Sequence, residues 1–220
     1  MFVLIQPLEK RKISIFFKIV AFALIIASCN EAPQHSSDRI KKSKQDISKR
    51  AERIIIQPLG LVDKTICKEV YNELSKIFPS VKLNKSKPMP QHAYYPSRRR
   101  YRADSIIAWL KMDTKADEKC IAITMVDIST SKGAYKDWGI MGLGYQPGPT
   151  SVASSYRLKD KNEFWKVVVH ELGHNFGLSH CTDKTCFMRD AEGGNPTNQE
   201  DHFCKKCRLV LLKAGWLLSN

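Results

Sequence analysis

The sequence has few histidines, no internal repeat and no long uninterrupted apolar run. Only six of its 220 residues are histidine, so an HExxH motif would arise by chance in about one such sequence in a hundred. The lack of repeats and low-complexity tracts excludes solenoid and fibrous architectures. The one apolar stretch, Ile13 to Ala27, is interrupted by Lys18 and is shorter than the roughly 20 residues that a membrane span needs.

Acidic residues are also scarce relative to basic ones. The chain carries 22 Asp and Glu against 36 Lys and Arg, a formal net charge of +14. A protein with this excess favours anionic surfaces such as membranes, polysaccharides or acidic peptides.

The first residues have the order of a bacterial lipoprotein signal peptide. Lys10, Arg11 and Lys12 precede the apolar stretch, which ends in small residues immediately before Cys29. This order predicts removal of residues 1–28, lipidation of Cys29, and a lipid-anchored membrane lipoprotein of the bacterial cell envelope, on its periplasmic or outer face. The competing interpretation is an uncleaved membrane helix, for which the stretch is short. Residues 29–53 lack aromatics and are rich in polar and charged residues, which predicts a tether.

The run HELGHNFGLSH, residues 170–180, predicts a catalytic zinc site. On a helix, His170 and His174 lie one turn apart on the same face and can bind one metal, with Glu171 beside the open coordination position. Gly177 favours the left-handed turn that ends the helix, so that His180 can return as the third ligand. The alternative is a pair of core histidines on a buried helix face.

Three nitrogen ligands leave zinc a position for water, whose pKa falls to about 7. We therefore expect a zinc-dependent metallopeptidase in which the zinc-bound water is activated by Glu171 and attacks a peptide bond. Two other classes remain open: a catalytically silent, zinc-stabilised binding lipoprotein, and a zinc amidase of other specificity.

Four cysteines follow the third histidine in two close pairs. Cys181 is the next residue after His180, Cys186 follows, and Cys204 and Cys207 form a CxxC. Four thiolates fit a closed tetrahedral structural zinc site, although two disulfides or four free thiols are possible. His202 lies near this group and is expected to support it without being a ligand.

These residues together resemble the archaemetzincin signature, HExxHxxGxxHC followed by CxM and CxxC. The residues that match are His170, Glu171, His174, Gly177, His180, Cys181, Cys186, Met188, Cys204 and Cys207. The spacer between Met188 and Cys204 is shorter than in the family pattern, which affects a surface loop. The resemblance implies a zinc metallopeptidase with two Zn²⁺, one catalytic and one structural, and a Met-turn at Met188 beneath the histidines.

The remainder of the chain predicts one α+β domain over residues 54–220, a zincin-like or metzincin-like fold with a mixed twisted sheet packed against helices. The sequence patterns favour strands at 53–58, 81–83, 120–128, 138–145 and 151–156, and helices at 63–78 and 103–112, a zinc helix opened near 160–162, and a last helix at about 203–218. The last helix brings in the CxxC of a C-terminal zinc site made by the four cysteines.

Glycines are concentrated around the predicted strand 138–145. They include Gly139, Gly142 and Gly144, and glycines at a sheet edge allow another backbone to approach closely. We therefore expect this strand to pair with an extended peptide or protein substrate over the zinc; a bulged edge strand without ligand is the alternative. Tyr145 and Tyr156 are both candidates to stabilise the oxyanion.

Residues 94–102 and two further cysteines also carry predictions. Tyrosines and arginines alternate over residues 94–102; export argues against nucleic acid as a partner, so we expect a solvated loop with Tyr95 or Tyr101 packed inward. Cys67 and Cys120 could form a disulfide or remain buried free thiols. We expect the protein to be a monomer.

Overall fold

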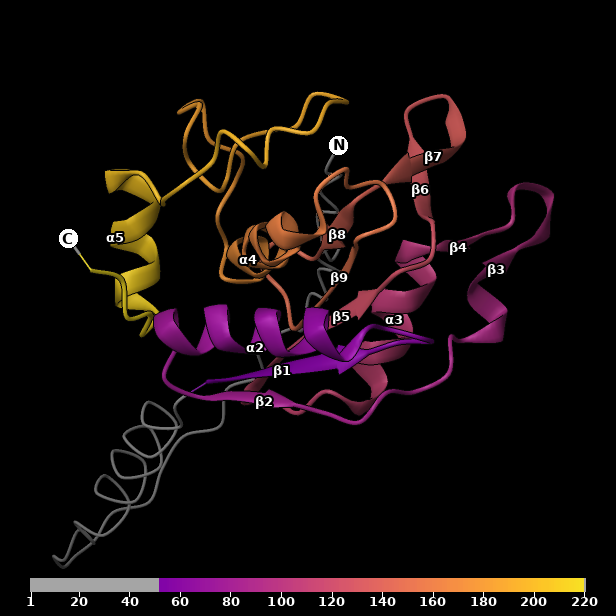
Figure 1. Ribbon diagram of the computed structural model, residues 1–220, viewed down its shortest axis with the longest axis horizontal. Coiled ribbons are helices and arrows are strands. Elements are labelled where there is room, and N and C mark those ends of the chain that lie inside the picture. The colour runs from indigo at the N-terminus through magenta and orange to yellow at the C-terminus, as the bar shows by residue number, and fades with distance from the viewer. Residues whose placement is uncertain (1–51, 220) are drawn as a thin grey trace, which may run out of the picture. The chain divides into compact units, whose positions relative to one another are not determined.

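The computed structural model describes residues 52–219 (Figure 1). The predicted signal peptide at 1–28, the lipidated Cys29 and all but the last two residues of the predicted tether lie outside the described residues. Within residues 52–219, no helix has both the length and the apolar character needed to cross a membrane.

A five-stranded mixed sheet forms the centre of the domain. Its order is β2 (Val81–Leu83), β1 (Arg53–Pro58), β5 (Glu118–Thr124), β9 (Thr150–Ser154) and β8 (Gly142–Gly144). The first four strands are parallel, and β8 pairs antiparallel with β9 at the edge. The middle of β1, Ile54–Ile56, and of β5, Cys120–Ile123, are continuous apolar runs because helices cover both faces of these two strands.

Helices pack on opposite faces of this sheet (Figure 1). Helices α2 (Lys64–Ile77) and α4 (Phe164–Asn175) contact one face, and α3 (Ala103–Asp113) contacts the other. Alternation along β1 separates the two cores: Ile54 and Ile56 join the α2 and α4 side, whereas Ile55 joins the α3 side. The α+β class and the mixed sheet covered by helices are confirmed.

A second, four-stranded sheet was not predicted, and its strands alternate along the chain with those of the first sheet. Its order is β3 (Tyr94–Tyr95), β4 (Arg100–Arg102), β6 (Ile128–Lys132) and β7 (Tyr135–Ile140). Two predicted single strands are therefore wrong. The strand predicted at 120–128 ends at Thr124 and a new one starts at Ile128, and the strand predicted at 138–145 is divided at Met141 between β7 and β8, which belong to different sheets.

The prediction of a solvated loop at residues 94–102 is wrong in part: residues 94–99 are exposed, as expected, but the segment contains two short strands. Short 3₁₀ helices, η1 (Gln91–Ala93) and η2 (Pro96–Arg98), lead into β3 and β4. The Arg100 guanidinium lies 3.1 Å from Asp127 and 3.4 Å from Asp137, and its side chain is only 13% exposed. These charge-assisted contacts hold Arg100 in the sheet, whereas Arg98, whose side chain is 61% exposed, remains largely in solvent. Tyr101 packs inward, as one of the two predicted alternatives requires.

The remaining helices follow the sequence signals closely. The Asp63 side chain caps α2 by accepting from the Thr65 amide, and η3 (Lys161–Glu163), capped by Asp160, precedes α4. Helix α5 (Lys205–Lys213) is shorter than predicted because the chain turns at Gly215, whose φ is +88°.

Cys67 and Cys120 are free thiols, so the disulfide alternative does not hold. Cys67 on α2 packs against the core beneath α2 and α4, whereas Cys120 on β5 faces the α3 side. The sheet separates the two side chains. Burial raises the pKa of Cys120 to about 11, which keeps this thiol protonated at neutral pH.

Candidate metal centre

Helix α4 carries the first two histidines and ends in a Schellman turn. Gly177, with φ of +92°, donates its amide to the His174 carbonyl, and Leu178 donates to the Gly173 carbonyl. Only glycine adopts this backbone at little cost. The turn reverses the chain and returns it to the helix, which is how His180 reaches the other two histidines.

The structure brings His170, His174 and His180 together. One ligand nitrogen from each lies within 4.8 Å of the others, and the Nε2 atoms of His170 and His174 are 3.0 Å apart. His170 and His174 are 1% exposed, whereas His180 is partly exposed. The cluster is therefore buried on the helix side and accessible through its third member.

The other ring nitrogen of each histidine has a fixed partner. His170 Nδ1 lies 2.6 Å from the Phe187 carbonyl oxygen, and His174 Nδ1 lies 2.7 Å from the Leu178 carbonyl oxygen. His180 Nδ1 lies 3.3 Å from the Asp190 carboxylate. Such contacts orient imidazoles and leave Nε2 as the ligand atom.

Burial keeps all three imidazoles neutral, the form that binds metal. Loss of hydration lowers the pKa of His170 well below its ordinary value and lowers that of His174 to about 4; it also lowers the pKa of His180. For His170, the two neighbouring histidines lower it further.

Glu171 is fully buried and is in close contact with the edge strand β8. A Cβ atom at Gly142 would lie 2.3 Å from Glu171 Oε1, and one at Gly144 would lie 3.0 Å from the Glu171 carbonyl oxygen. The approach of Glu171 thus requires glycine at these positions, a role that the sequence did not predict, and pairing of this strand with a peptide stays a prediction. Neither Glu171 carboxylate oxygen has a hydrogen-bond partner among residues 52–219, and burial raises the pKa of Glu171.

Met188 lies against the helix between the two histidines. It is fully buried, and a Cβ atom at Gly173 would be 2.3 Å from its sulfur. The Met188 carbonyl accepts a hydrogen bond of 2.7 Å from the Cys181 amide. Met188 therefore joins the histidine-bearing helix to the first cysteine.

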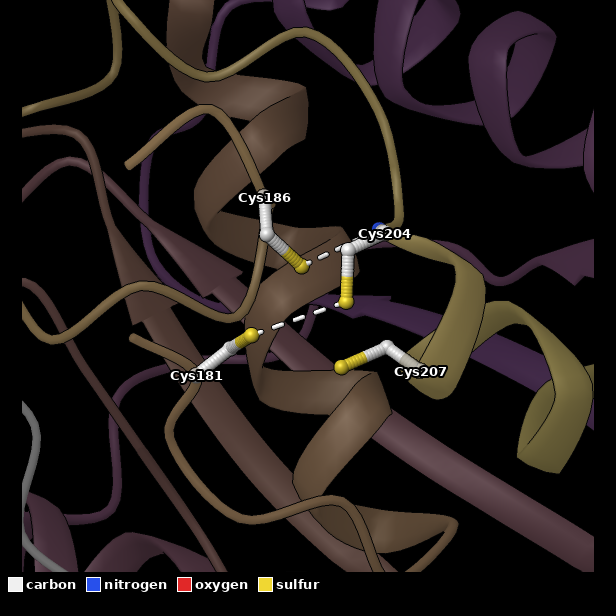
Figure 2. Close-up of side chains that lie close together, drawn as sticks. All are labelled: Cys181, Cys186, Cys204 and Cys207. Atoms are coloured by element: carbon white, nitrogen blue, oxygen red, sulfur yellow. Dashed lines mark hydrogen bonds between the residues drawn. The ribbon is translucent and has the colours of Figure 1, made fainter. Parts of the chain in front are cut away.

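The structure also brings together Cys181, Cys186, Cys204 and Cys207, all of them free thiols whose sulfurs lie within 4.8 Å of one another. Figure 2 shows the four sulfurs turned toward one point, with Cys207 on α5 and Cys204 just before it. The Cys181 and Cys204 sulfurs are 3.6 Å apart, too far for a disulfide, whose sulfurs are about 2.0 Å apart.

Cys186 is the cysteine most stabilised as a thiolate. A hydrogen bond with the Cys207 thiol is the main cause that lowers the Cys186 pKa, to about 5. Its sulfur also accepts from the Met188 amide at 3.5 Å and the Cys204 amide at 3.4 Å. Amide donors of this kind stabilise a sulfur ligand.

Both groups have dimensions that fit zinc. Tetrahedral zinc with bonds of about 2.0–2.1 Å to nitrogen and about 2.3 Å to sulfur holds its ligands roughly 3.4 Å and 3.8 Å apart. The observed 3.0 Å between nitrogens and 3.6 Å between sulfurs are close to these values. The buried Glu171 carboxylate beside the histidines has no hydrogen-bond donor among the described residues, which fits a group that accepts a proton at the metal.

Other predicted residues lie apart from these clusters. His202 is hydrogen-bonded to Asp201 and is 53% exposed, outside the cysteine cluster, as expected. Tyr156 is largely exposed, and the Tyr145 ring packs beside the Lys111 ammonium, so the choice between these tyrosines stays open.

Sequence reasoning missed several residues that position the site. The Asn175 side chain accepts from Ser151 at 2.7 Å and donates to the carbonyls of Tyr145 and Thr150, which ties the end of α4 to β8 and β9. Asp190 supports His180, and Gly173 admits Met188. The only signal in the sequence was proximity to the HExxH motif.

A known protein family and several of its members match this chain. The family model described as peptidase family M54 matches residues 52–213. The archaemetzincin of Natronomonas pharaonis is 29% identical over 174 residues, which cover 71% of this chain and 98% of that protein. That of Haloarcula marismortui is 32% identical over 149 residues, covering 60% and 83%.

Solved structures show the same fold. The archaemetzincin of Archaeoglobus fulgidus, complexed with malonate, matches with a TM-score of 0.63 and 28% identity over 72% of this chain and 99% of that chain. The archaemetzincin of Methanopyrus kandleri matches with a TM-score of 0.64 and 24% identity over 76% and 97%.

Proposed function

Because this chain belongs to peptidase family M54 and is a zinc metallopeptidase, we propose that it hydrolyses peptide bonds with Glu171 as general base. The observation that carries this proposal is the Glu171 carboxylate. It is fully buried, one position after His170 on α4, and without a hydrogen-bond partner among the described residues. A carboxylate whose pKa is raised by burial is suited to accept a proton and return it.

The three histidines would hold the catalytic ion through Nε2, since their Nδ1 atoms contact Phe187, Leu178 and Asp190. Zinc bound there would polarise the substrate carbonyl and lower the pKa of the attacking water. Glu171 takes a proton as the water oxygen bonds to the carbonyl carbon. Glu171 then donates that proton to the amine nitrogen as the carbon–nitrogen bond breaks.

We propose that the four cysteines hold a second, structural zinc. Their donor set has no open position. Cys181 directly follows His180, so a closed sulfur site would also fix the loop that carries the third histidine.

We propose that the substrate binds as an added strand along β8. The Met141 carbonyl and the Tyr145 amide both bond to β9. Since alternate residues of a strand direct their backbone groups to opposite neighbours, those of Gly142 and Gly144 point to the other side. No described strand pairs there, because β8 is the last strand of the sheet. An extended peptide could pair with this edge directly beside Glu171.

The test is cleavage of a complex peptide library by the full chain in detergent, with and without chelator, read by mass spectrometry. The Glu171→Gln variant keeps the size of the side chain but cannot act as a base, so we expect kcat/KM to fall at least about a thousandfold with zinc content unchanged. Full activity of this variant would contradict the mechanism. If the wild-type chain cleaves no bond, the silent binding lipoprotein or a zinc amidase replaces the peptidase.

We also propose, from the sequence, that lipidated Cys29 anchors the domain to the bacterial envelope. Two results are expected for Cys29→Ser: loss of metabolic labelling by a fatty acid, and recovery of the protein in the soluble fraction. Unchanged labelling and membrane recovery would overturn the proposed anchor.

A further inference from the structure

A cavity of about 440 Å³ lies where β7 passes into β8. One wall is the main chain from Gly139 to Met141, a second is formed by arginine side chains, and a third is the loop segment 193–195. Met141 directly precedes Gly142, the residue in contact with Glu171. A peptide paired with β8 would therefore continue toward this cavity.

The arginines outnumber the carboxylates around the cavity. Arg98, Arg100 and Arg157 line it, and they share two aspartates. Arg157 donates two hydrogen bonds to the Asp127 carboxylate, from Nε at 2.8 Å and from Nη2 at 2.9 Å. The Arg98 guanidinium lies 3.5 Å from the Asp137 carboxylate. The three cations and two anions leave a net positive charge.

The most exposed charged side chains around the cavity are also positive. The side chains of Asp127 and Asp137 are 11% exposed and that of Arg100 is 13% exposed, whereas Arg157 is 35% and Arg98 is 61% exposed. Solvent in the cavity therefore meets the guanidinium groups of Arg98 and Arg157 more than the carboxylates. Guanidinium groups bind carboxylates through paired hydrogen bonds.

The lack of a side chain at Gly139 on β7 makes room for the Arg157 guanidinium. A Cβ atom at Gly139 would lie 2.1 Å from the Arg157 guanidinium, so the guanidinium lies directly against the main chain of β7. Any side chain at position 139 would displace it. The loop across the cavity adds Gly193 and Gly194, which also leave space.

We propose that this arginine cavity is a substrate subsite that binds a carboxylate of the peptide being cleaved. The inference rests on the proposed peptidase function. With a rise of about 3.3 Å per strand residue, a peptide on β8 reaches the cavity with a residue two or three positions from the cleaved bond. The carboxylate can belong to a Glu or Asp side chain or to the peptide C-terminus.

The experiment compares three peptides built around one bond that the library identifies as cleaved. The first has Glu at the cavity position and an amidated C-terminus, and the second has Gln there and is otherwise the same. The third ends at a Gln in that position with a free carboxylate. We expect the Glu peptide, the free-carboxylate peptide or both to be cleaved with a kcat/KM about tenfold above that of the neutral peptide. Which of the two gains identifies the source of the carboxylate.

Arg98→Glu is the test variant and Arg99→Glu is its control. Arg99 is the next residue, is exposed and does not line the cavity, so both variants change the net charge equally. We expect Arg98→Glu to remove the preference for the acidic peptide while the neutral peptide stays within about twofold, and Arg99→Glu to keep it. Arg98→Gln, which only removes the charge, serves if Arg98→Glu lowers the melting temperature.

A binding measurement separates this inference from the proposed function. Calorimetry of the same peptides with the Glu171→Gln chain reports affinity without cleavage. Equal affinity for the acidic and neutral peptides, or equal behaviour of Arg98→Glu and Arg99→Glu, overturns the subsite. Undiminished cleavage by the Glu171→Gln chain, together with a retained, Arg98-dependent acidic preference in binding, overturns the proposed role of Glu171 and supports the subsite.

Discussion

Gly173 is the residue whose missing side chain admits Met188 beneath the histidines. Gly173→Ala should lower the free energy of unfolding by about 1–3 kcal/mol, because its Cβ would lie 2.3 Å from the fully buried Met188 sulfur. Urea denaturation measures the loss. The same substitution in a Met188→Ala background should cost less, since the colliding atom is gone. An equal cost in both backgrounds would mean that Met188 is not the obstacle.

Glu200 is a buried acid whose burial costs stability as the pH rises. Burial raises its pKa to about 8, although Lys166 and Arg189 oppose the shift. A carboxyl whose folded-state pKa is raised contributes stability that is full below its ordinary pKa and lost as the pH rises toward 8. Glu200→Gln should thus be more stable than the wild type by about 1–3 kcal/mol at pH 8, and the difference should disappear below pH 4.

Thermal unfolding across this pH range measures the effect. Glu192→Gln, at an exposed carboxylate of the same loop, is the matched control and should not reproduce the trend. A pH-independent difference for Glu200→Gln would show that the carboxylate does not titrate in this range.

At the scale of elements, we expect a peptide bound to the edge strand β8 to form backbone hydrogen bonds at every second residue. The backbone groups of Gly142 and Gly144 point away from β9, so only alternate amides of a bound peptide can bond to them. N-methylation of successive peptide amides near the cleaved bond should raise KM at alternate positions, by about tenfold for each lost hydrogen bond. A uniform effect at all positions would contradict strand addition.

The local parts of the site were predictable from the sequence because helix geometry fixes them. His170 and His174 are one turn apart on any helix, and Gly177 marks the turn that returns His180. The groups that orient the histidines were not predictable, because they include the main-chain carbonyls of Phe187 and Leu178, which any residue could supply.

The fold was predictable element by element but not in its division into sheets. Residues 138–145 read as one strand because nothing at Met141 signals an interruption, yet β7 pairs with β6 and β8 with β9. The contact between Gly142 and Glu171 joins residues far apart in the sequence and depends on that pairing. The glycines signalled a close approach, and only the structure identified the approaching group.

For the whole molecule, removal of metal should separate activity from stability. We expect two zinc ions per chain by mass spectrometry of metals, and one in Cys207→Ser. The cysteine site joins the 181–186 loop to α5, so its loss should lower the melting temperature by about 10 °C or more. Loss of the histidine zinc alone, in His174→Ala, should abolish activity with a smaller thermal effect. Two ions in Cys207→Ser would contradict the assignment.

With both proposed ions bound, the adjacency of His180 and Cys181 would make each ion an effector of the other. Closing the sulfur site restricts the loop that carries the third imidazole, so part of the ordering cost of the nitrogen site has already been met when its ion arrives. Thermodynamic linkage then requires the reverse: occupation of the nitrogen site must tighten the sulfur site by the same factor. Because one peptide bond joins a ligand of each site, the chain would bind its two zinc ions cooperatively. Chains with a single zinc ion would therefore be scarce at any intermediate zinc concentration.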